Sequence, residues 1–392
     1  MYYSKKFGMI YDCLTEEEAK LFAHYKTSHD FCSNSRLGFV FDFYNELMET
    51  ENTLPETPLQ VGINLTDICN LKCRHCSRKN LLNSENSCFI KRWKEVIDEL
   101  AFNGVFQIFL TGGEPLLHPE ILEIIEYIKS KNIFVAILTN GILLTDKLVY
   151  KLDSLLVDEF DYIQISVDGI GSTYEDMRRG AKFTDIKERL ELLKKHVVKT
   201  QVAMVVNEIT YKEMLEVYQL CLKNDINSIR FMPMFDNDCL EVEKCDDTKI
   251  IKEFVKVLRD KQDFGRKIDI AGDPVSLVYP FAIWFRSQYP EVYFPTGKHV
   301  CPAGVTSCEI SVHGEVYPCS YLENNIFFAG NIYEEKLKDL WKRQIWNCVR
   351  VRRPKSEKCM GCIEKDKCLG GCPASSFFRY KKFNYADGNC RI

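Results

Sequence analysis

Cysteine is the residue type whose spacing in this sequence most directly indicates chemistry. Of 18 cysteines, three fall in one short run with the spacing C-x3-C-x2-C, at Cys69, Cys73 and Cys76. Iron–sulfur cubes normally take four protein thiolates. Three thiolates in one loop can hold three irons of a [4Fe–4S] cluster and leave the fourth iron open. The triad therefore predicts a cluster with a coordination site for a ligand that is not protein.

A second group of cysteines lies near the C-terminal end of the chain. Its eight members are Cys301, Cys308, Cys319, Cys359, Cys362, Cys368, Cys372 and Cys390. In a secreted chain so many cysteines would indicate disulfides, but in a reducing compartment they indicate metal ligands. The N-terminus lacks the apolar segment of a signal peptide. We therefore expect a cytoplasmic protein whose cysteines bind metal.

Zinc is the alternative metal for both groups. A structural zinc site closes with four nitrogen or sulfur ligands, and His75 is available as a fourth ligand beside Cys76. The pair Cys359 and Cys362 also has the spacing of a zinc ribbon. We favour iron because His75 lies inside the tight loop and because eight downstream cysteines suffice for two fully ligated clusters.

The composition is that of an ordinary globular protein. The 392 residues are 46% hydrophobic and 28% charged, and the formal net charge is -4. Such a chain can bury a large core, and its charge gives no reason to expect a nucleic-acid partner. The apolar runs are as short as strands, so we expect no membrane partner.

Strand-like and helix-like segments alternate along the middle of the chain. Hydrophobic periodicity predicts strands over 60–65, 107–110, 134–138, 162–167, 201–206 and 228–232, and helices over 89–102, 119–130, 147–157, 184–197 and 211–223. This alternation predicts parallel β-α-β units in an α/β fold. Six units fall short of a closed barrel of eight. We therefore expect an open, partial barrel with its site at the carboxyl ends of the strands.

The rest of the chain divides around this barrel. We expect an N-terminal extension over 1–57, the barrel over 58–235, a connector over 236–300 with a helix over 248–258, and a small cysteine-rich module over 301–392. The module should contain a hairpin over 309–317 that turns at His313 and Gly314, and a helix over 333–349. The extension, read from its sequence alone, could be a simple cap on the barrel; the family resemblance described below also allows a reduced peptide-recognition element.

Three further motifs follow the predicted strands. Gly112-Gly113-Glu114-Pro115 follows the second strand, Ser166 and Asp168 follow the fourth, and Arg179 lies further on. Alone, each has an ordinary explanation: a plain turn for the first two motifs and a surface arginine for the third. Together with the cysteine triad they have a more specific meaning.

Residues 58–235 resemble the radical S-adenosylmethionine (SAM) superfamily, and residues 301–392 resemble the SPASM extension of some of its members. The resemblance implies a partial (β/α)6 barrel in which the open iron of the triad chelates the amino and carboxylate groups of SAM. An electron from the cluster would then cleave SAM to a 5′-deoxyadenosyl radical. The cofactors carry this step, and the protein orients and shields them.

The resemblance also assigns residues. Those assigned to SAM are Gly112, Gly113, Glu114 and Pro115 for the methionine part, Ser166 and Asp168 for the ribose, and Arg179 for the carboxylate. His75 would shield the cluster or contact the adenine. The first auxiliary [4Fe–4S] cluster would take Cys301, Cys308, Cys319 and Cys372, and the second Cys359, Cys362, Cys368 and Cys390. The implied cofactors are three [4Fe–4S] clusters and SAM.

The most favoured function is oxidative maturation of a ribosomally made peptide by hydrogen abstraction, giving a crosslink, a thioether or an inverted stereocentre. A precursor peptide and a reductant such as flavodoxin or ferredoxin would be the partners. The alternatives are oxidation of a small molecule such as a sugar or aminocyclitol, and an iron–sulfur electron carrier without turnover. Sulfatase-maturing relatives place an aspartate where this chain has Ser320, which argues against formylglycine formation. Cys239 and Cys245 are candidate hydrogen-atom donors.

Overall fold

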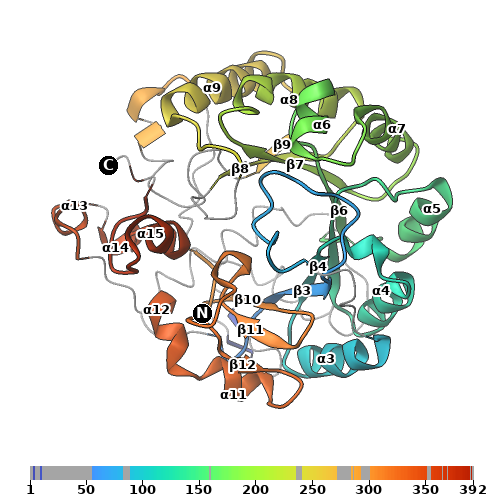
Figure 1. Ribbon diagram of the computed structural model, residues 1–392, viewed down its shortest axis with the longest axis vertical. Helices are drawn as coiled ribbons and strands as arrows, with labels where there is room; N and C mark the ends of the chain where they lie inside the picture. The colour runs from blue at the N-terminus through green and yellow to red at the C-terminus, as the bar shows by residue number, and fades with distance from the viewer. Residues whose placement is uncertain are drawn as a thin grey trace.

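The strands that the sequence predicts form the central part of one continuous sheet (Figure 1). The computed structural model describes residues 3–4, 9–10, 55–82, 89–158, 160–234, 241–271, 284–285, 287–292, 301–350, 355–363, 365–368, 370–388 and 390. The cysteines at positions 13, 32, 88 and 239, and most of the predicted N-terminal extension and of the second half of the connector, lie outside these residues. No helix in the described part of the chain has both the length and the apolar character to cross a membrane.

Seven strands of the sheet run parallel in chain order. They are β3 (Gln60–Thr66), β4 (Gln107–Gly112), β5 (Phe134–Thr139), β6 (Tyr162–Ser166), β7 (Thr200–Val206), β8 (Ser228–Pro233) and β9 (Asp269–Ala271). The six predicted strands are confirmed to within two residues, and β9 is an addition. The α/β fold with an open parallel barrel is therefore the observed one.

Helices cover the outer face of these strands in an arc (Figure 1). They are α3 (Ile90–Phe102), α4 (Ile121–Ser130), α5 (Asp146–Leu155), α6 (Gly171–Met177), α7 (Phe183–Leu193), α8 (Met214–Lys223) and α9 (Asp247–Asp263). In α3 the buried residues are Trp93, Val96, Ile97 and Leu100, which recur at helical spacing on one face. The five predicted barrel helices are confirmed, and the short helix α6 is an addition.

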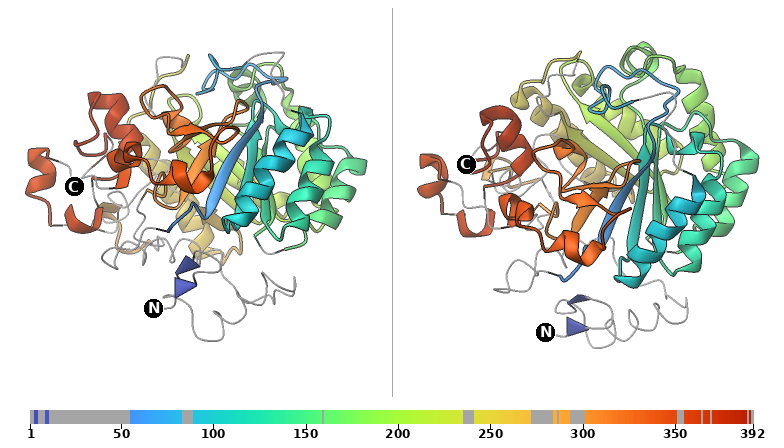
Figure 2. Two further views of the ribbon diagram at one scale, coloured as in Figure 1. Left: turned by 90° about the horizontal axis from the view of Figure 1, so that it is seen from below. Right: turned by 60° about the horizontal axis from the view of Figure 1, so that its bottom comes forward.

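The cysteine-rich module continues the same sheet. Its strands β10 (Ser307–Ile310), β11 (Glu315–Tyr317) and β12 (Gly330–Asn331) give the order β12-β11-β10-β3-β4-β5-β6-β7-β8-β9. Strand β10 pairs parallel with β3, although almost 250 residues separate them. Figure 2 shows the orange strands of the module beside the blue strand β3. The module therefore extends the open barrel at its first strand.

The predicted hairpin of the module is present. Strands β10 and β11 pair antiparallel, and Gly314 between them has a φ of 81°. This left-handed conformation is one that glycine adopts without steric cost, which explains the turn at this position.

The helix predicted over 333–349 is wrong, because this segment forms three short elements. They are α11 (Leu337–Trp341), the 3-10 turn η4 (Gln344–Trp346) and α12 (Asn347–Arg350). The Trp346 indole donates a hydrogen bond to the Leu340 carbonyl at 2.7 Å, and Arg350 donates to the Trp341 carbonyl at 2.7 Å. These side chains satisfy carbonyls at the end of α11 and turn both tryptophans into the core, where their ring centroids lie 4.9 Å apart.

Candidate active site

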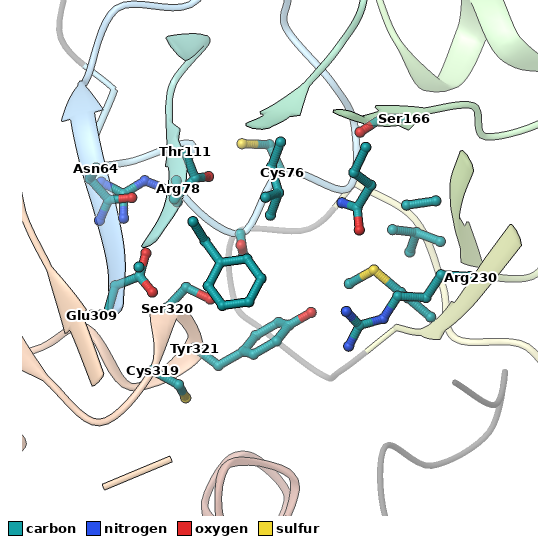
Figure 3. Close-up of a pocket in the computed structure, with 18 of the residues that line it drawn as sticks. Asn64, Cys76, Arg78, Thr111, Ser166, Arg230, Glu309, Cys319, Ser320 and Tyr321 are labelled. Atoms are coloured by element: carbon teal, nitrogen blue, oxygen red, sulfur yellow. The ribbon is translucent and has the colours of Figure 1, made fainter. Parts of the chain in front are cut away.

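A cavity of about 630 Å³ lies between the barrel strands and the cysteine-rich module. Its walls come from the strands β3 to β8, from the loop after β3, from residues 301–322 and from residues 372–374. Figure 3 shows Cys76 and Ser166 at one end of the cavity and Cys319, Ser320 and Tyr321 at the other. A cavity of this size can hold a ligand as large as a drug molecule.

The three cysteines of the triad all line this cavity. Cys69, Cys73 and Cys76 follow β3 in a loop that has no regular secondary structure. The loop is fixed by the segment after α6, since Lys72 N donates to the Arg179 carbonyl and Arg74 N donates to the Met177 carbonyl, both at 2.9 Å. Three thiols on one short, anchored loop are a suitable donor set for three irons of a cluster.

The two glycines of the second motif bring it against the cysteine loop. Gly112 has a φ of 131°, and a Cβ on either Gly112 or Gly113 would overlap the carbonyl of Thr66 or of Ile68. Gly113 N donates to the Thr66 carbonyl at 2.6 Å, and Glu114 N donates to the Ile68 carbonyl at 2.8 Å. The glycines therefore hold the end of β4 directly on the start of the cysteine loop.

Glu114 is the member of this motif whose side chain reaches the cavity. Its buried carboxylate accepts hydrogen bonds from Thr139 Oγ1 at 2.6 Å, from Asn140 N at 2.8 Å and from Leu116 N at 3.1 Å. Burial raises the pKa of Glu114, and these hydrogen bonds oppose that effect. The carboxylate is thus fixed where it borders the cavity and can face a cationic group. Pro115 is buried at the start of the 3-10 turn η1 (Pro115–Leu117) and lies outside the wall.

Asp168 is fully buried and does not line the cavity. Its Oδ2 lies 2.7 Å from Arg178 Nε and 3.1 Å from His75 Nε2, and its Oδ1 accepts a hydrogen bond from Val205 N at 2.7 Å. Burial alone would raise the pKa of Asp168, but the charges of Arg178 and His75 hold it well below its usual range. Asp168 therefore orients two side chains of the cavity wall. Its predicted contact with a ribose has no support in this geometry.

Arg178, and not the predicted Arg179, is the arginine of this pair that lines the cavity. Arg178 is buried, lines the cavity and lies 3.9 Å from Cys73 Sγ. Arg179 points away from the cavity, is half exposed and pairs with Glu241 at 2.7 Å. Both are arginines, so composition could not distinguish them. The burial of Asp168 decides which of the two arginines is buried, because a buried carboxylate requires a cation beside it.

Ser166 and His75 both border the cavity. Ser166 is the last residue of β6, which ends one residue before the predicted end of this strand. His75 belongs to the cysteine loop, and its contact with Asp168 at 3.1 Å favours the predicted shielding role over a contact with a ligand. Burial raises the pKa of the Cys73 thiol to about 11, and the nearby charge of Arg178 opposes this effect. Arg178 would therefore stabilise a thiolate at Cys73.

Four downstream cysteines face the same cavity from its other end, namely Cys301, Cys308, Cys319 and Cys372. Burial raises the pKa of Cys319 to about 12, and the neighbouring Cys301 adds to the shift. Burial also raises the pKa of Cys372, with contributions from Cys301 and Cys319. The three residues pack in the same hydrophobic cluster of the module, although Cys372 comes from a distant part of the sequence.

The remaining four cysteines of the module lie in its outer part. Cys359 is in α13 (Glu357–Met360), Cys362 follows it, Cys368 ends α14 (Lys365–Cys368), and Cys390 lies near the C-terminus. Burial raises the pKa of Cys368 to about 12, with contributions from Cys390 and Cys359. None of the four lines the cavity. The assignment of the eight cysteines to two clusters stays a prediction.

A buried charged network on the cavity wall was not predicted from the sequence. Arg78 pairs with Glu323 and with Asp67, the latter at 3.1 Å. With its amide suitably oriented, Asn64 donates to Glu309 Oε1 at 3.2 Å and accepts from Arg78 Nη1 at 2.9 Å. Burial raises the pKa of Glu309 to about 8. The network joins the cysteine loop to β10, and no short motif indicates it because its members are far apart in sequence.

The structure describes one of the two candidate hydrogen-atom donors. Cys245 is buried, donates to the Asp246 carbonyl at 3.4 Å and does not border the cavity. Burial raises its pKa to about 12. Cys239 lies outside the described residues. Cys245 is therefore not placed to meet a radical in this cavity.

Two protein families match the chain. The family described as the radical SAM superfamily matches residues 63–221, and the family described as an iron-sulfur cluster-binding domain, SPASM, matches residues 301–363. The first match contains the second half of β3, the strands β4 to β7 and the cysteine triad, and the second contains β10 to β12.

Three curated proteins are similar over most of the chain. The antilisterial bacteriocin subtilosin biosynthesis protein AlbA of Bacillus subtilis is 28% identical over 80% of this chain and 67% of its own length. The AdoMet-dependent heme synthase of Methanosarcina barkeri is 25% identical over 83% of this chain and 93% of its own length. The mycofactocin maturase MftC of Mycobacterium tuberculosis is 25% identical over 86% of this chain and 83% of its own length.

A solved structure shares the fold. The crystal structure of Streptococcus suis SuiB bound to S-adenosylmethionine superimposes with a TM-score of 0.71 at 20% identity, over 95% of this chain and 88% of that one. At this identity the likeness concerns the arrangement of the elements alone.

Proposed function

The chain belongs to the radical SAM superfamily and carries a SPASM iron–sulfur domain, and we propose that it matures a ribosomally made peptide by abstracting a hydrogen atom from it. Iron–sulfur clusters and SAM are the cofactors of this class. Two of the similar proteins have peptide-related names, a bacteriocin biosynthesis protein and a maturase. The observation that carries the proposal is the single cavity that reaches from the cysteine triad to the cysteines of the module.

The residues at one end of the cavity fit the cofactors of this class. Cys69, Cys73 and Cys76 would ligate three irons of the first cluster, Glu114 would face the amino group of SAM, and Ser166 would face its ribose. The bound cluster and SAM would supply the radical that takes the hydrogen atom. Arg178, held by Asp168, places a fixed positive charge beside Cys73 and would offset the negative charge of a cluster there.

The module would contribute two further [4Fe–4S] clusters. Cys301, Cys308, Cys319 and Cys372 would hold the cluster at the cavity, and Cys359, Cys362, Cys368 and Cys390 would hold the outer one. A cluster at the cavity can accept the electron that remains on the substrate after hydrogen abstraction. The outer cluster can pass it on to a flavodoxin or ferredoxin, which we propose as the redox partner. The residues over 1–57 would help to bind the peptide.

The test uses the anaerobically reconstituted protein with SAM, reduced flavodoxin and each short peptide encoded beside the gene. Mass spectrometry should show formation of 5′-deoxyadenosine and a changed peptide. A mass loss of two hydrogens indicates a crosslink or a thioether, and deuterium uptake from solvent at unchanged mass indicates epimerisation.

The Cys73→Ala variant is the control and should form neither product. If the wild-type protein changes no peptide but oxidises a sugar or an aminocyclitol, the peptide proposal is wrong.

A further inference from the structure

Arg230 presents a guanidinium group to the cavity without a protein counter-charge. It lies within β8, where alternation places Arg230 and Met232 on the same face, and both line the cavity. Among the residues that the structure describes, Arg230 forms no ion pair and no hydrogen bond through its side chain. Figure 3 shows its guanidinium directed into the cavity, toward the Tyr321 hydroxyl.

The other two arginines of the cavity wall are compensated. Arg78 pairs with Glu323 and Asp67, and Arg178 pairs with Asp168. A guanidinium that is partly removed from water requires a partner, because its desolvation is otherwise uncompensated. Arg230 therefore differs from its neighbours in having a charge for which the described part of the chain supplies no partner.

The surroundings of Arg230 suit an anion. Tyr162 and Tyr321 line the same cavity as Arg230, and Figure 3 shows the Tyr321 hydroxyl beside the Arg230 guanidinium. A guanidinium offers a planar fork of N–H donors that matches a carboxylate, and phenolic hydroxyls can donate further hydrogen bonds. Glu309 lies across the cavity, on the side opposite to Arg230 (Figure 3).

The position of Arg230 is suited to the substrate rather than to SAM. In the register of the sheet, Ser166 is opposite Ala203, and Ala203 is opposite Arg230. Two strand spacings put Arg230 about 10 Å from Ser166 across the sheet. The small side chain of Ala203 leaves the space between them open. The other residues proposed for SAM, the triad and Glu114, lie on the far side of Ser166, after β3 and β4.

We propose that Arg230, together with Tyr162 and Tyr321, binds a carboxylate of the substrate and so positions it beside the reacting group. In a peptide, this carboxylate is an aspartate or glutamate side chain or the C-terminal carboxylate. The inference rests on the proposed function only for the claim that the substrate is a peptide. Carboxylate binding by Arg230 can be tested without turnover.

The experiment measures binding to the reconstituted protein in the presence of SAM by equilibrium dialysis. The probes are acetyl-Ala-Glu-Ala-amide, acetyl-Ala-Gln-Ala-amide and acetyl-Ala-Gln-Ala with a free C-terminal carboxylate. The wild-type protein should bind one or both carboxylate probes about tenfold more tightly than the neutral probe. The probe that is preferred identifies the source of the carboxylate.

Two variants make the test specific. Arg230→Gln should abolish the preference and leave the affinity for SAM unchanged. Arg259→Gln is the matched control, because Arg259 is exposed on α9 and pairs with Glu291, and it should behave as the wild type. Equal binding of the three probes, no detectable binding of any, or a preference that survives in Arg230→Gln overturns the inference. So does a loss of SAM affinity in Arg230→Gln, which would make Arg230 a SAM ligand.

A second measurement separates the inference from the proposed function. Each Asp or Glu of a peptide that the wild type modifies is changed in turn to Asn or Gln, and the C-terminus is amidated. With the wild-type enzyme, one of these changes should raise the KM for the peptide about tenfold. With the Arg230→Gln enzyme, the same change should leave the KM as it is for the unchanged peptide. If no peptide is modified, the proposed function fails, and the binding experiment still decides the role of Arg230.

Discussion

Arg178 and Arg179 are adjacent in sequence but lie in opposite environments. Arg178 is buried beside Asp168, whereas Arg179 is half exposed and pairs with a surface glutamate. The difference shows what organises this end of the cavity: a buried carboxylate whose two cationic partners come from the cysteine loop and from the segment after α6. The position of Arg178 relative to Cys73 is therefore set by Asp168.

This contrast gives a prediction for stability. In Arg178→Met, His75 is, among the described residues, the one cationic partner that remains beside the fully buried Asp168. Breaking a buried ion pair costs about 3 kcal/mol of unfolding free energy. Arg179→Met removes only a surface pair, which is worth about 1 kcal/mol or less. Urea unfolding of the two variants, monitored by tryptophan fluorescence, should show this difference. Equal losses in both variants would mean that the Arg178–Asp168 pair does not stabilise the fold.

Glu309 gives a prediction for pH dependence. Its pKa in the folded protein is about 8, above the ordinary value of 4.5. A raised pKa means that the folded state binds the proton more tightly than the unfolded state. The resulting stability is fully present below about pH 4.5 and is lost as the pH rises toward 8.

The Glu309→Gln variant cannot lose this proton. The unfolding free energy of the variant minus that of the wild type should therefore grow by roughly 1 kcal/mol per pH unit between pH 6 and pH 8. Denaturant unfolding at pH 6, 7 and 8 measures it. Glu126→Gln, an exposed change on α4, should show no such trend. A constant difference between wild type and Glu309→Gln would show that Glu309 has an ordinary pKa.

The residue scale also shows how far sequence reasoning extends. The cysteine triad, Glu114 and Ser166 could be placed at the cavity because their spacing and their positions after strands are local features. The roles of Asp168 and Arg178 could not, because they depend on burial. The sequence does not indicate a role for Arg230, since a single arginine inside a strand has no local signature. Its significance appears only when the residues around it are known.

At the scale of elements, strand β10 is what attaches the module to the barrel. In the parallel pair, Glu309 of β10 is opposite Gly62 of β3. A Cβ at Gly62 would overlap the Glu309 carboxylate. The absence of a side chain on β3 therefore makes room for a charged side chain from the module.

A double-mutant cycle tests this fit. Gly62→Ala should destabilise the protein by about 1–3 kcal/mol through overpacking. In the Glu309→Ala background the same change should cost almost nothing, because the obstructing carboxylate is gone. The coupling is measured from urea unfolding of the four proteins. Additive effects would show that β3 and β10 do not meet at this pair.

The elements themselves were predicted unequally well, for a physical reason. The barrel strands and helices have strong hydrophobic periodicity and short connections, so each could be identified from its own residues. The segment over 333–349 has helical periodicity too, but the hydrogen bond of Trp346 to Leu340 ends the helix. The pairing of β10 with β3 joins strands remote in sequence, and no local pattern encodes it.

At the scale of the whole molecule, the sheet connects two sets of thiols across one cavity. The chain returns to the start of the barrel through β10, and this return brings Cys308 and Cys319 to the open side of the cavity. The C-terminal segment then crosses back, so that Cys372 lies beside Cys301 and Cys319 while Cys368, only four residues earlier, lies near Cys390. The two proposed auxiliary sites are thus interleaved in sequence, with one set of cysteines at the cavity and the other away from it.

This interleaving predicts the iron content of paired variants. The three proposed clusters, with four irons each, should give about twelve irons per chain in the reconstituted wild type. Cys319→Ala and Cys372→Ala should each lose about four, and their double variant should lose no more than either alone, because both cysteines serve one cluster. Combining Cys319→Ala with Cys368→Ala should lose about eight. Iron and sulfide analysis under anaerobic conditions measures these values. In the contrary outcome, the iron loss of Cys372→Ala adds to that of Cys319→Ala but not to that of Cys368→Ala. Cys372 would then belong to the outer cluster, and its position near Cys301 and Cys319 would not determine which cluster it ligates.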